Sequence, residues 1–178
     1  MLPRKLHVEE DNEKIEFVRD QRASVNRVVG VVIGASKELL GLGDANAPNL
    51  IMRFEPYFNA VKASSEGLIQ RRSRRYITNI TADNTKSCKV LLNDLGIDVR
   101  HLEQIRSNVV MSEKEMISDL SQPHPNSPRT KLPYSNVAEF LDQQKEIFEA
   151  LWKDLHPCRP KDKRARRGTR PADNRDFY

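Results

Sequence analysis

Residues 74–102, RRYITNITADNTKSCKVLLNDLGIDVRHL, decide the fold class of this chain. The first seven residues alternate in polarity as a strand does, and Thr81 is a suitable N-cap for a helix that runs to about Leu95. Gly96 is typical of the position just after a helix end, and residues 97–102 alternate again as a strand. The order strand, helix, strand predicts an α/β sheet with helices packed on it.

The same patterns predict the elements on either side. Residues 25–36 (VNRVVGVVIGAS) centre on a β-branched run and predict a buried strand, and residues 41–44 (GLGD) predict a flexible connection. The connection lacks the third glycine and the element order of a dinucleotide-binding motif. The further expected elements are a helix at 54–69, a strand at 109–111, a loop at 121–133, a short strand at Tyr134 and a helix at 137–155. For the last helix, Asn136 is the expected N-cap with Glu139 as its acidic partner, and Phe148 and Trp152 are expected to be buried.

These elements predict a mixed sheet flanked by helices in a single domain. We expect a polar, partly helical lead-in at residues 1–24, the α/β domain at 25–157 and a basic tail at 158–178. The tail contains almost no apolar residue before Phe177, so we expect it to be disordered.

The positive charge of the chain is concentrated in that tail. The formal net charge is +5, and residues 159–178 contain eight basic and three acidic residues, which leaves 22 of each sign in the rest of the chain. A nucleic-acid-binding surface over the whole domain is therefore not indicated, whereas a basic arm is. Its candidate phosphate-binding residues are Lys161, Lys163, Arg164, Arg166, Arg167 and Arg170.

The sequence contains no familiar catalytic or metal-binding motif. Histidine spacings typical of zinc sites are absent, as are the nucleophile elbow and the phosphate-binding loop of nucleoside triphosphatases. The two cysteines, Cys88 and Cys158, have no metal-ligand spacing and are expected to be free thiols. We expect no cofactor and no metal. Without a secretory signal or an apolar run of membrane-spanning length, we expect a cytoplasmic location and no membrane partner.

Polar side chains gather at the ends of the predicted strands. Ligands in open α/β sheets collect at strand ends and helix N-termini, where an arginine and a histidine could hold an anion. We therefore predict a site for an anionic or polyhydroxylated small molecule. The alternative is that Arg100 and His101 are structural residues that tie the strands together. The predicted ligand-binding residues are Thr78, Thr81, Asn84, Arg100, His101 and Asn108.

Three blocks in this order resemble the N-terminal sensor region of archaeal sensor histidine kinases of the ammonia-oxidiser type. They are residues 75–81 with Asn84 and Cys88; residues 99–105 with Asn108, Ser112 and Glu115; and residues 134–137 with Gln143, Gln144, Phe148, Leu151 and Trp152. The resemblance covers roughly residues 25–155. That sensor region in turn is similar to half of a phospholipase-D-type α/β fold, as found in sugar-sensing archaeal transcription regulators.

The resemblance implies binding rather than catalysis. The phospholipase reaction needs a His-x-Lys pair, but His101 is followed by Leu102 and Glu103. No kinase domain follows the resembling region, so we expect a chain that is not an enzyme.

The leading hypothesis is an orphan input domain of signal transduction that binds a small ligand or a partner protein, such as a separate kinase or receiver. The alternatives are a small nucleic-acid-associated transcription regulator that uses the basic tail, and a degenerate fragment of a sensor kinase.

Overall fold

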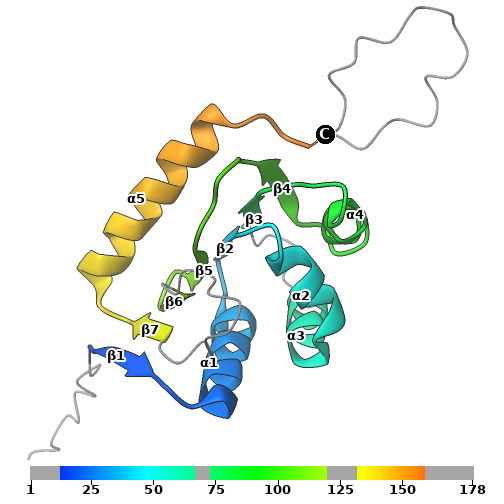
Figure 1. Cartoon of the computed structure of the whole chain (residues 1–178). Helices are drawn as coiled ribbons and strands as arrows, with labels where there is room; N and C mark the ends of the chain where they lie inside the picture. The colour runs from blue at the N-terminus through cyan, green and yellow to red at the C-terminus, as the bar shows by residue number, and fades with distance from the viewer. Residues whose placement is uncertain (1–12, 67–72, 120–131, 159–178) are drawn as a thin grey trace, which may run out of the picture.

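The computed structural model describes residues 13–66, 73–119 and 132–158. Within these ranges, seven strands and five helices form one sheet with helices on both faces (Figure 1). In chain order the elements are β1 (Ile15–Val18), α1 (Gln21–Gly34), β2 (Glu38–Gly43), α2 (Ala47–Arg53), α3 (Glu55–Glu66), β3 (Ser73–Thr78), α4 (Thr85–Asn93), β4 (Asp98–His101), β5 (Asn108–Ser112), β6 (Met116–Asp119), β7 (Leu132–Ser135) and α5 (Ala138–Asp154).

The sheet combines a parallel half and an antiparallel half. Its strand order is β1-β7-β6-β5-β2-β3-β4. β2, β3 and β4 are parallel, and α2, α3 and α4 lie in the connections between them. β5, β6, β7 and β1 extend the sheet beyond β2 by antiparallel pairing. The prediction of a mixed sheet flanked by helices is confirmed.

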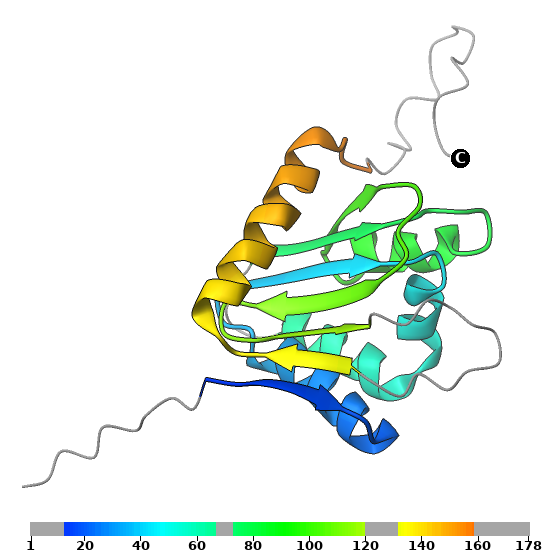
Figure 2. The same ribbon diagram turned by 60° about the vertical axis from the view of Figure 1, so that its left-hand side comes forward.

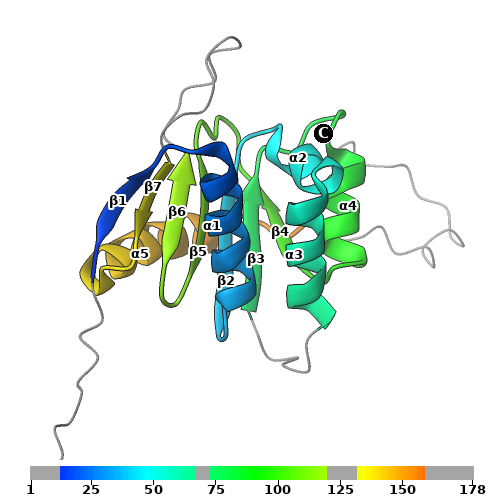
Figure 3. The same ribbon diagram turned by 90° about the horizontal axis from the view of Figure 1, so that it is seen from below.

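The two faces of the sheet are covered differently. Helices α1 to α4 lie on one face and α5 alone covers the other (Figures 1 and 3). Figure 2 shows α5 running across the strands rather than along them. The predicted burial of its aromatic residues is confirmed, because Phe148 and Trp152 are only 3% and 8% exposed and their rings stack at 5.7 Å.

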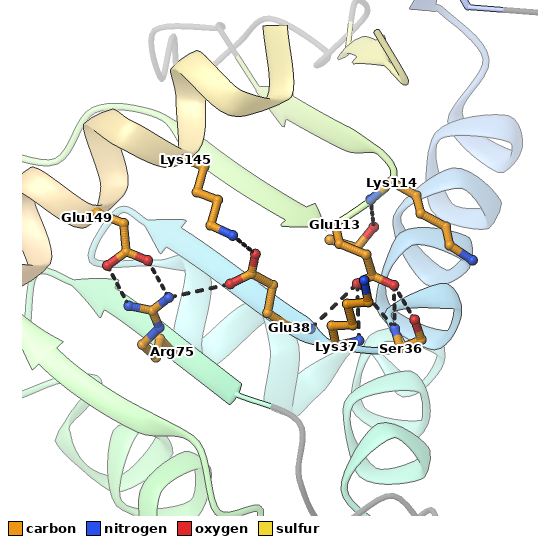
Figure 4. A network of polar contacts seen from close by, with 9 residues as sticks. Ser36, Lys37, Glu38, Arg75, Glu113, Lys114, Lys145 and Glu149 are labelled. Atoms are coloured by element: carbon orange, nitrogen blue, oxygen red, sulfur yellow. Dashed lines mark hydrogen bonds and ion pairs between the residues drawn. The ribbon is translucent and has the colours of Figure 1, made fainter. Parts of the chain in front are cut away.

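Two arginines from the parallel strands hold α5 against the sheet. The first, Arg75, makes two hydrogen bonds to Glu149, at 2.5 and 2.8 Å, and lies 3.5 Å from Glu38, which also pairs with Lys145 (Figure 4). The hydrogen bonds from Arg75 lower the pKa of Glu149 and outweigh its partial desolvation, which by itself would raise that pKa. These contacts join two strands to the middle of α5 by charge-assisted hydrogen bonds. The second arginine, Arg100, donates hydrogen bonds to backbone carbonyls at the end of α5.

The turn between β5 and β6 is joined to the end of α1 by one carboxylate. Glu113 accepts hydrogen bonds from the backbone N–H groups of Ser36 and Lys37 at 3.0 and 3.2 Å, and from the Ser36 hydroxyl (Figure 4). Desolvation by itself would raise the pKa of this carboxyl, but the hydrogen bonds outweigh it and lower the pKa to about 2. The carboxylate therefore stays ionised at neutral pH.

The prediction of a strand at residues 25–36 is wrong, because residues 25–34 lie in the helix α1. Asp20 begins the helix by accepting a hydrogen bond from the N–H of Ala23 at 2.8 Å. Val25, Val28, Val29 and Val32 recur at the spacing of one helix face and turn toward the sheet. The packing of that face outweighs the β preference of valine.

The flexible connection predicted at residues 41–44 is also wrong, because Gly41 and Gly43 belong to β2, a strand in the interior of the sheet. The side chain of Tyr76, on the neighbouring strand, occupies the space where a Cβ at either glycine would lie. A Cβ on Gly41 would lie 2.5 Å from the Tyr76 ring, and a Cβ on Gly43 would overlap the Tyr76 hydroxyl and lie 2.8 Å from the Ala47 side chain. The glycines are therefore found where the Tyr76 side chain passes close over the backbone of β2, and not in a loop.

Helix starts differ from prediction by a few residues. α4 begins after Asn84 rather than after Thr81. α5 begins after Val137, and the predicted cap Asn136 instead accepts a hydrogen bond from the N–H of Lys14 at 2.7 Å. The short strands β1 and β6 and the helix α2 were not predicted.

Most of the predicted loop at 121–133 and the basic tail from residue 159 lie outside the described residues. No helix in the described ranges is long and apolar enough to cross a membrane.

Candidate functional site

Polar residues form a row along one edge of the sheet, where the parallel strands end. His101 pairs with Thr78, Thr78 pairs with Gly43, and Asn108 pairs with Asp119. Val109 pairs with Leu42, so Asn108 lies beside Gly43. We call His101, Thr78, Gly43, Asn108 and Asp119 the edge row. It crosses five adjacent strands at the carboxyl edge of the parallel half, where α/β sheets commonly bind ligands.

Asp44, directly after β2, connects the middle of the edge row. Its N–H donates to Asn108 Oδ1 at 2.9 Å, and its carbonyl oxygen accepts from Thr78 Oγ1 at 3.1 Å. Its carboxylate accepts from the N–H groups of Asn46 and Ala47 at 2.8 and 3.0 Å, just before and at the start of α2. Asp44 is thus a buried structural residue that fixes how α2 leaves the sheet.

Asn84 performs a similar role next to the edge row. Its side chain is fully buried. The amide nitrogen donates to the carbonyl oxygens of Ala45 and Asn79 at 2.7 and 2.8 Å, and the amide oxygen accepts from the N–H of Thr81 at 2.8 Å. Both amide protons are used, so Asn84 holds two loops together and has no donor left for a ligand.

His101 retains a free polar group. Its Nδ1 accepts a hydrogen bond from the N–H of Ile80 at 3.0 Å, which places the ring proton of the neutral imidazole on Nε2. The ring is half-buried, and Nε2 makes no hydrogen bond to a described residue. His101 therefore offers one N–H donor at the end of β4.

Arg100 does not join the edge row, because successive residues of a strand point to opposite faces. Its guanidinium lies 3.9 Å from the centre of the Trp152 ring and donates to the carbonyl oxygens of Trp152 and Leu155, the latter at 2.8 Å. These carbonyls lie at the end of α5, where helix carbonyls lack the usual intrahelical partners, and the Trp152 oxygen also accepts from the N–H of Leu155 at 3.3 Å. The structure thus separates Arg100 from the other five predicted residues and gives it a structural role on the α5 face.

Two acidic residues at this edge were missed by sequence reasoning. Asp44 lies in the segment whose glycines predict a flexible connection. Asp119 ends β6, and this strand of four residues follows a charged turn and has no clear periodic pattern. Both carboxylates are buried, at 9% and 6% exposure. An aspartate directly after a Gly-x-Gly segment was the signal that could have indicated Asp44.

The chemistry of this edge is hydrogen bonding by neutral groups beside two buried carboxylates. Among the described residues, no group of three or more His, Cys, Asp or Glu side chains is placed to hold a metal ion. The Tyr76 hydroxyl lies under Gly43 on the same face. Desolvation raises its pKa far above the ordinary value of tyrosine, so it remains protonated.

Comparison with known proteins gives information on the fold alone. No family model and no curated protein matches the sequence. NucT from Helicobacter pylori is 12% identical with a TM-score of 0.59, over 82% of this chain and 98% of that chain. Nuc from Salmonella typhimurium, a phospholipase D family member, is 10% identical with a TM-score of 0.58, over 83% and 99%. The chain is similar to phospholipase-D-like α/β folds.

The archaeal chromatin protein TrmBL2, described with a novel mode of DNA binding, has the same fold. It is 15% identical with a TM-score of 0.57, over 84% of this chain and 56% of that chain. This chain therefore spans little more than half the length of that protein. The fold implied by the resemblance to sensor regions is supported, but none of these three structures is described as a sensor or a kinase.

The expectation that this chain is not an enzyme is contradicted by these comparisons. It depended on the missing His-x-Lys pair at His101. A phospholipase D family member shares the fold over 83% of this chain, so the domain is one that supports catalysis in that family. The absence of one motif at one histidine is not a ground for excluding an enzyme at 10% identity.

Proposed function

We propose that this chain is a nucleic-acid-associated protein, in which a phospholipase-D-like domain is joined to a basic C-terminal segment that contacts phosphates. The observation that carries the proposal is the distribution of charge. The whole net charge of +5 falls on residues 159–178, and the rest of the chain is neutral. Such a basic segment next to a neutral domain favours binding to a polyanion.

The solved structures of this fold support the proposal. TrmBL2 is a chromatin protein that binds DNA, and it matches 84% of this chain. The described domain adds hydrogen-bond donors rather than charge, such as the Nε2–H of His101 at the carboxyl edge. We therefore expect the basic segment to supply most of the affinity.

The test is the binding of a fluorescein-labelled, random-sequence DNA duplex, measured by anisotropy at several salt concentrations. If about five phosphates are neutralised, the logarithmic salt dependence should have a slope of about −4.5. The affinity should then fall on the order of 500-fold between about 50 and about 200 mM salt. Exchanging bases should change the affinity little, because phosphate contacts carry no sequence information.

Two variants locate the binding. The first replaces Lys161, Lys163, Arg164, Arg166, Arg167 and Arg170 by Gln, and it should abolish binding. The matched control changes the four arginines among them to Lys and keeps the charge, so it should bind within a few-fold of the unmodified chain. Equal melting temperatures would show that the domain is intact. Undiminished binding by the Gln variant would contradict the proposal and move the interface to the neutral domain.

A further inference from the structure

A large apolar cavity lies between the sheet and the helices on the α1 side. Its volume is about 690 Å³. Three valines of α1, Val25, Val28 and Val29, line it on the helix side, and Gly41 and Tyr76 line it on the sheet side. Protein interiors rarely contain voids much larger than a water molecule, whereas binding pockets for small molecules span roughly 300–1,000 Å³. The cavity thus has the size of a ligand site.

The side chains around the cavity explain why the helix and sheet do not fill it. Valine side chains are short, and on the sheet side the Tyr76 ring lies over Gly41 and lines the same cavity, which these side chains do not fill. Val25, Val28 and Val29 are consequently only half-buried, although they face the sheet rather than solvent. Their apolar surface stays in contact with water unless another apolar group covers it.

The cavity opens at the edge that carries the candidate site. Among its lining residues, Arg19, Gln21, Asn46 and Leu50 are exposed, and they lie near the N-terminal ends of α1 and α2. Asn108 and Asp119 of the edge row also line it. A molecule that entered here would have its body among valines and its outer end near the amides of Gln21 and Asn46 and the guanidinium of Arg19.

We infer that this cavity is a binding site for a small, uncharged amphipathic molecule, with a branched aliphatic or aromatic body and a hydroxyl or amide group at one end. The valine and tyrosine walls match the body, and the exposed amide of Asn46 matches the polar end, since the Asn108 amide already bonds Asp44 through both its oxygen and its nitrogen. Burying a charged group among these largely apolar walls would cost free energy, which favours an uncharged molecule. This ligand class differs from the anionic or polyhydroxylated one that the sequence predicted, and the inference does not depend on nucleic-acid binding.

The probe for the test is N-phenyl-1-naphthylamine, an uncharged aromatic molecule whose fluorescence rises in apolar surroundings. We expect the full chain to bind it at a single saturable site and to gain melting temperature, because a ligand that binds only the folded state stabilises it. Val28→Phe, which fills the cavity, should weaken binding at least tenfold. Ile33→Phe is the matched control on the same helix, at a residue 54% exposed and outside the cavity, and should bind as the unmodified chain does.

A second variant keeps the test decisive if Val28→Phe does not fold. Asn46→Trp alters an exposed residue at the opening whose side chain makes no cap hydrogen bond, so the fold should tolerate it. It should also weaken binding several-fold by blocking entry. Absence of saturable binding by the unmodified chain would overturn the inference. So would equal affinities for the unmodified chain, Asn46→Trp and Ile33→Phe, because the probe would then be bound elsewhere.

Discussion

The two faces of the sheet attach their helices with different kinds of side chain. On the α5 face, Arg75 and Arg100 reach up from the strands, and both contact Trp152, whose ring centre lies 5.4 Å and 3.9 Å from the two guanidinium carbons. On the α1 face, valines of the helix face the Tyr76 ring, which lies over Gly41, across a cavity. The difference shows that the two arginines, which reach from the strands to the helix, close the α5 interface, whereas the short valines of α1 leave space above the sheet.

The largest expected effect is the loss of Arg100 from the α5 face. In Arg100→Gln, the carbonyl oxygens of Trp152 and Leu155 lose their charged donor and Trp152 loses its stacking partner, so we expect a destabilisation of about 3 kcal/mol. The melting temperature should fall by roughly 6–12 °C for a domain of this size. Thermal unfolding followed by circular dichroism measures it.

The same variant separates the structural role of Arg100 from the predicted ligand role. A binding residue would leave the melting temperature nearly unchanged when replaced. Arg100→Lys serves as the control, because it keeps the charge but loses the planar donor geometry, and it should recover only part of the stability. Unchanged melting temperatures in both variants would contradict the role of Arg100 in attaching α5 to the sheet.

A smaller effect is expected where Tyr76 crosses β2 on the α1 face. Gly43→Ala forces a methyl group into the space of the Tyr76 hydroxyl and should cost about 2 kcal/mol. Tyr76→Phe removes that hydroxyl, which makes no hydrogen bond of acceptable geometry although Thr78 lies near it. Alone, it should change stability by less than about 1 kcal/mol.

The double variant, Gly43→Ala with Tyr76→Phe, sharpens this prediction. Removing the hydroxyl relieves the worst overlap with the new methyl group, although the ring carbon at 2.9 Å and the Ala47 side chain at 2.8 Å still crowd it, so the combined change should cost less than the sum of the two single changes. Urea unfolding of the four proteins gives the coupling energy. Strict additivity would show that the Ala47 side chain, rather than Tyr76, limits the space at Gly43.

The smallest effect concerns Glu113, which fastens the end of α1. Its pKa is lowered to about 2 in the folded state, so its contribution to stability is complete above the pKa of an ordinary glutamate and is lost as the pH falls toward 2. Since the group is largely solvated, we expect Glu113→Gln to cost only about 1 kcal/mol at pH 7. The variant should differ less from the unmodified chain near pH 2, as urea unfolding at both pH values can show.

Part of the candidate site was predictable and part was not. Thr78, His101 and Asn108 were placed correctly at strand ends, because alternation and helix signals locate the ends of strands within a few residues. Asp44, the hydrogen-bond partner of Thr78 and Asn108, was not predictable, since it follows a strand whose glycines are typical of a loop. The direction of Arg100 was not predictable either, because a shift of one residue in a strand reverses the face.

By itself the sequence determined that the chain is an α/β protein, that residues 137–155 form a helix with Phe148 and Trp152 buried, and that the positive charge lies at the C-terminal end. These follow from periodicity and composition, which are local properties. Only the tertiary structure decided that the valine run of α1 is a helix and that Gly41 and Gly43 belong to the interior strand β2. The physical reason is the same for both: a valine-rich segment and a glycine pair have weak or misleading local preferences, and their conformation is set by the partners they meet, the sheet face and the Tyr76 ring.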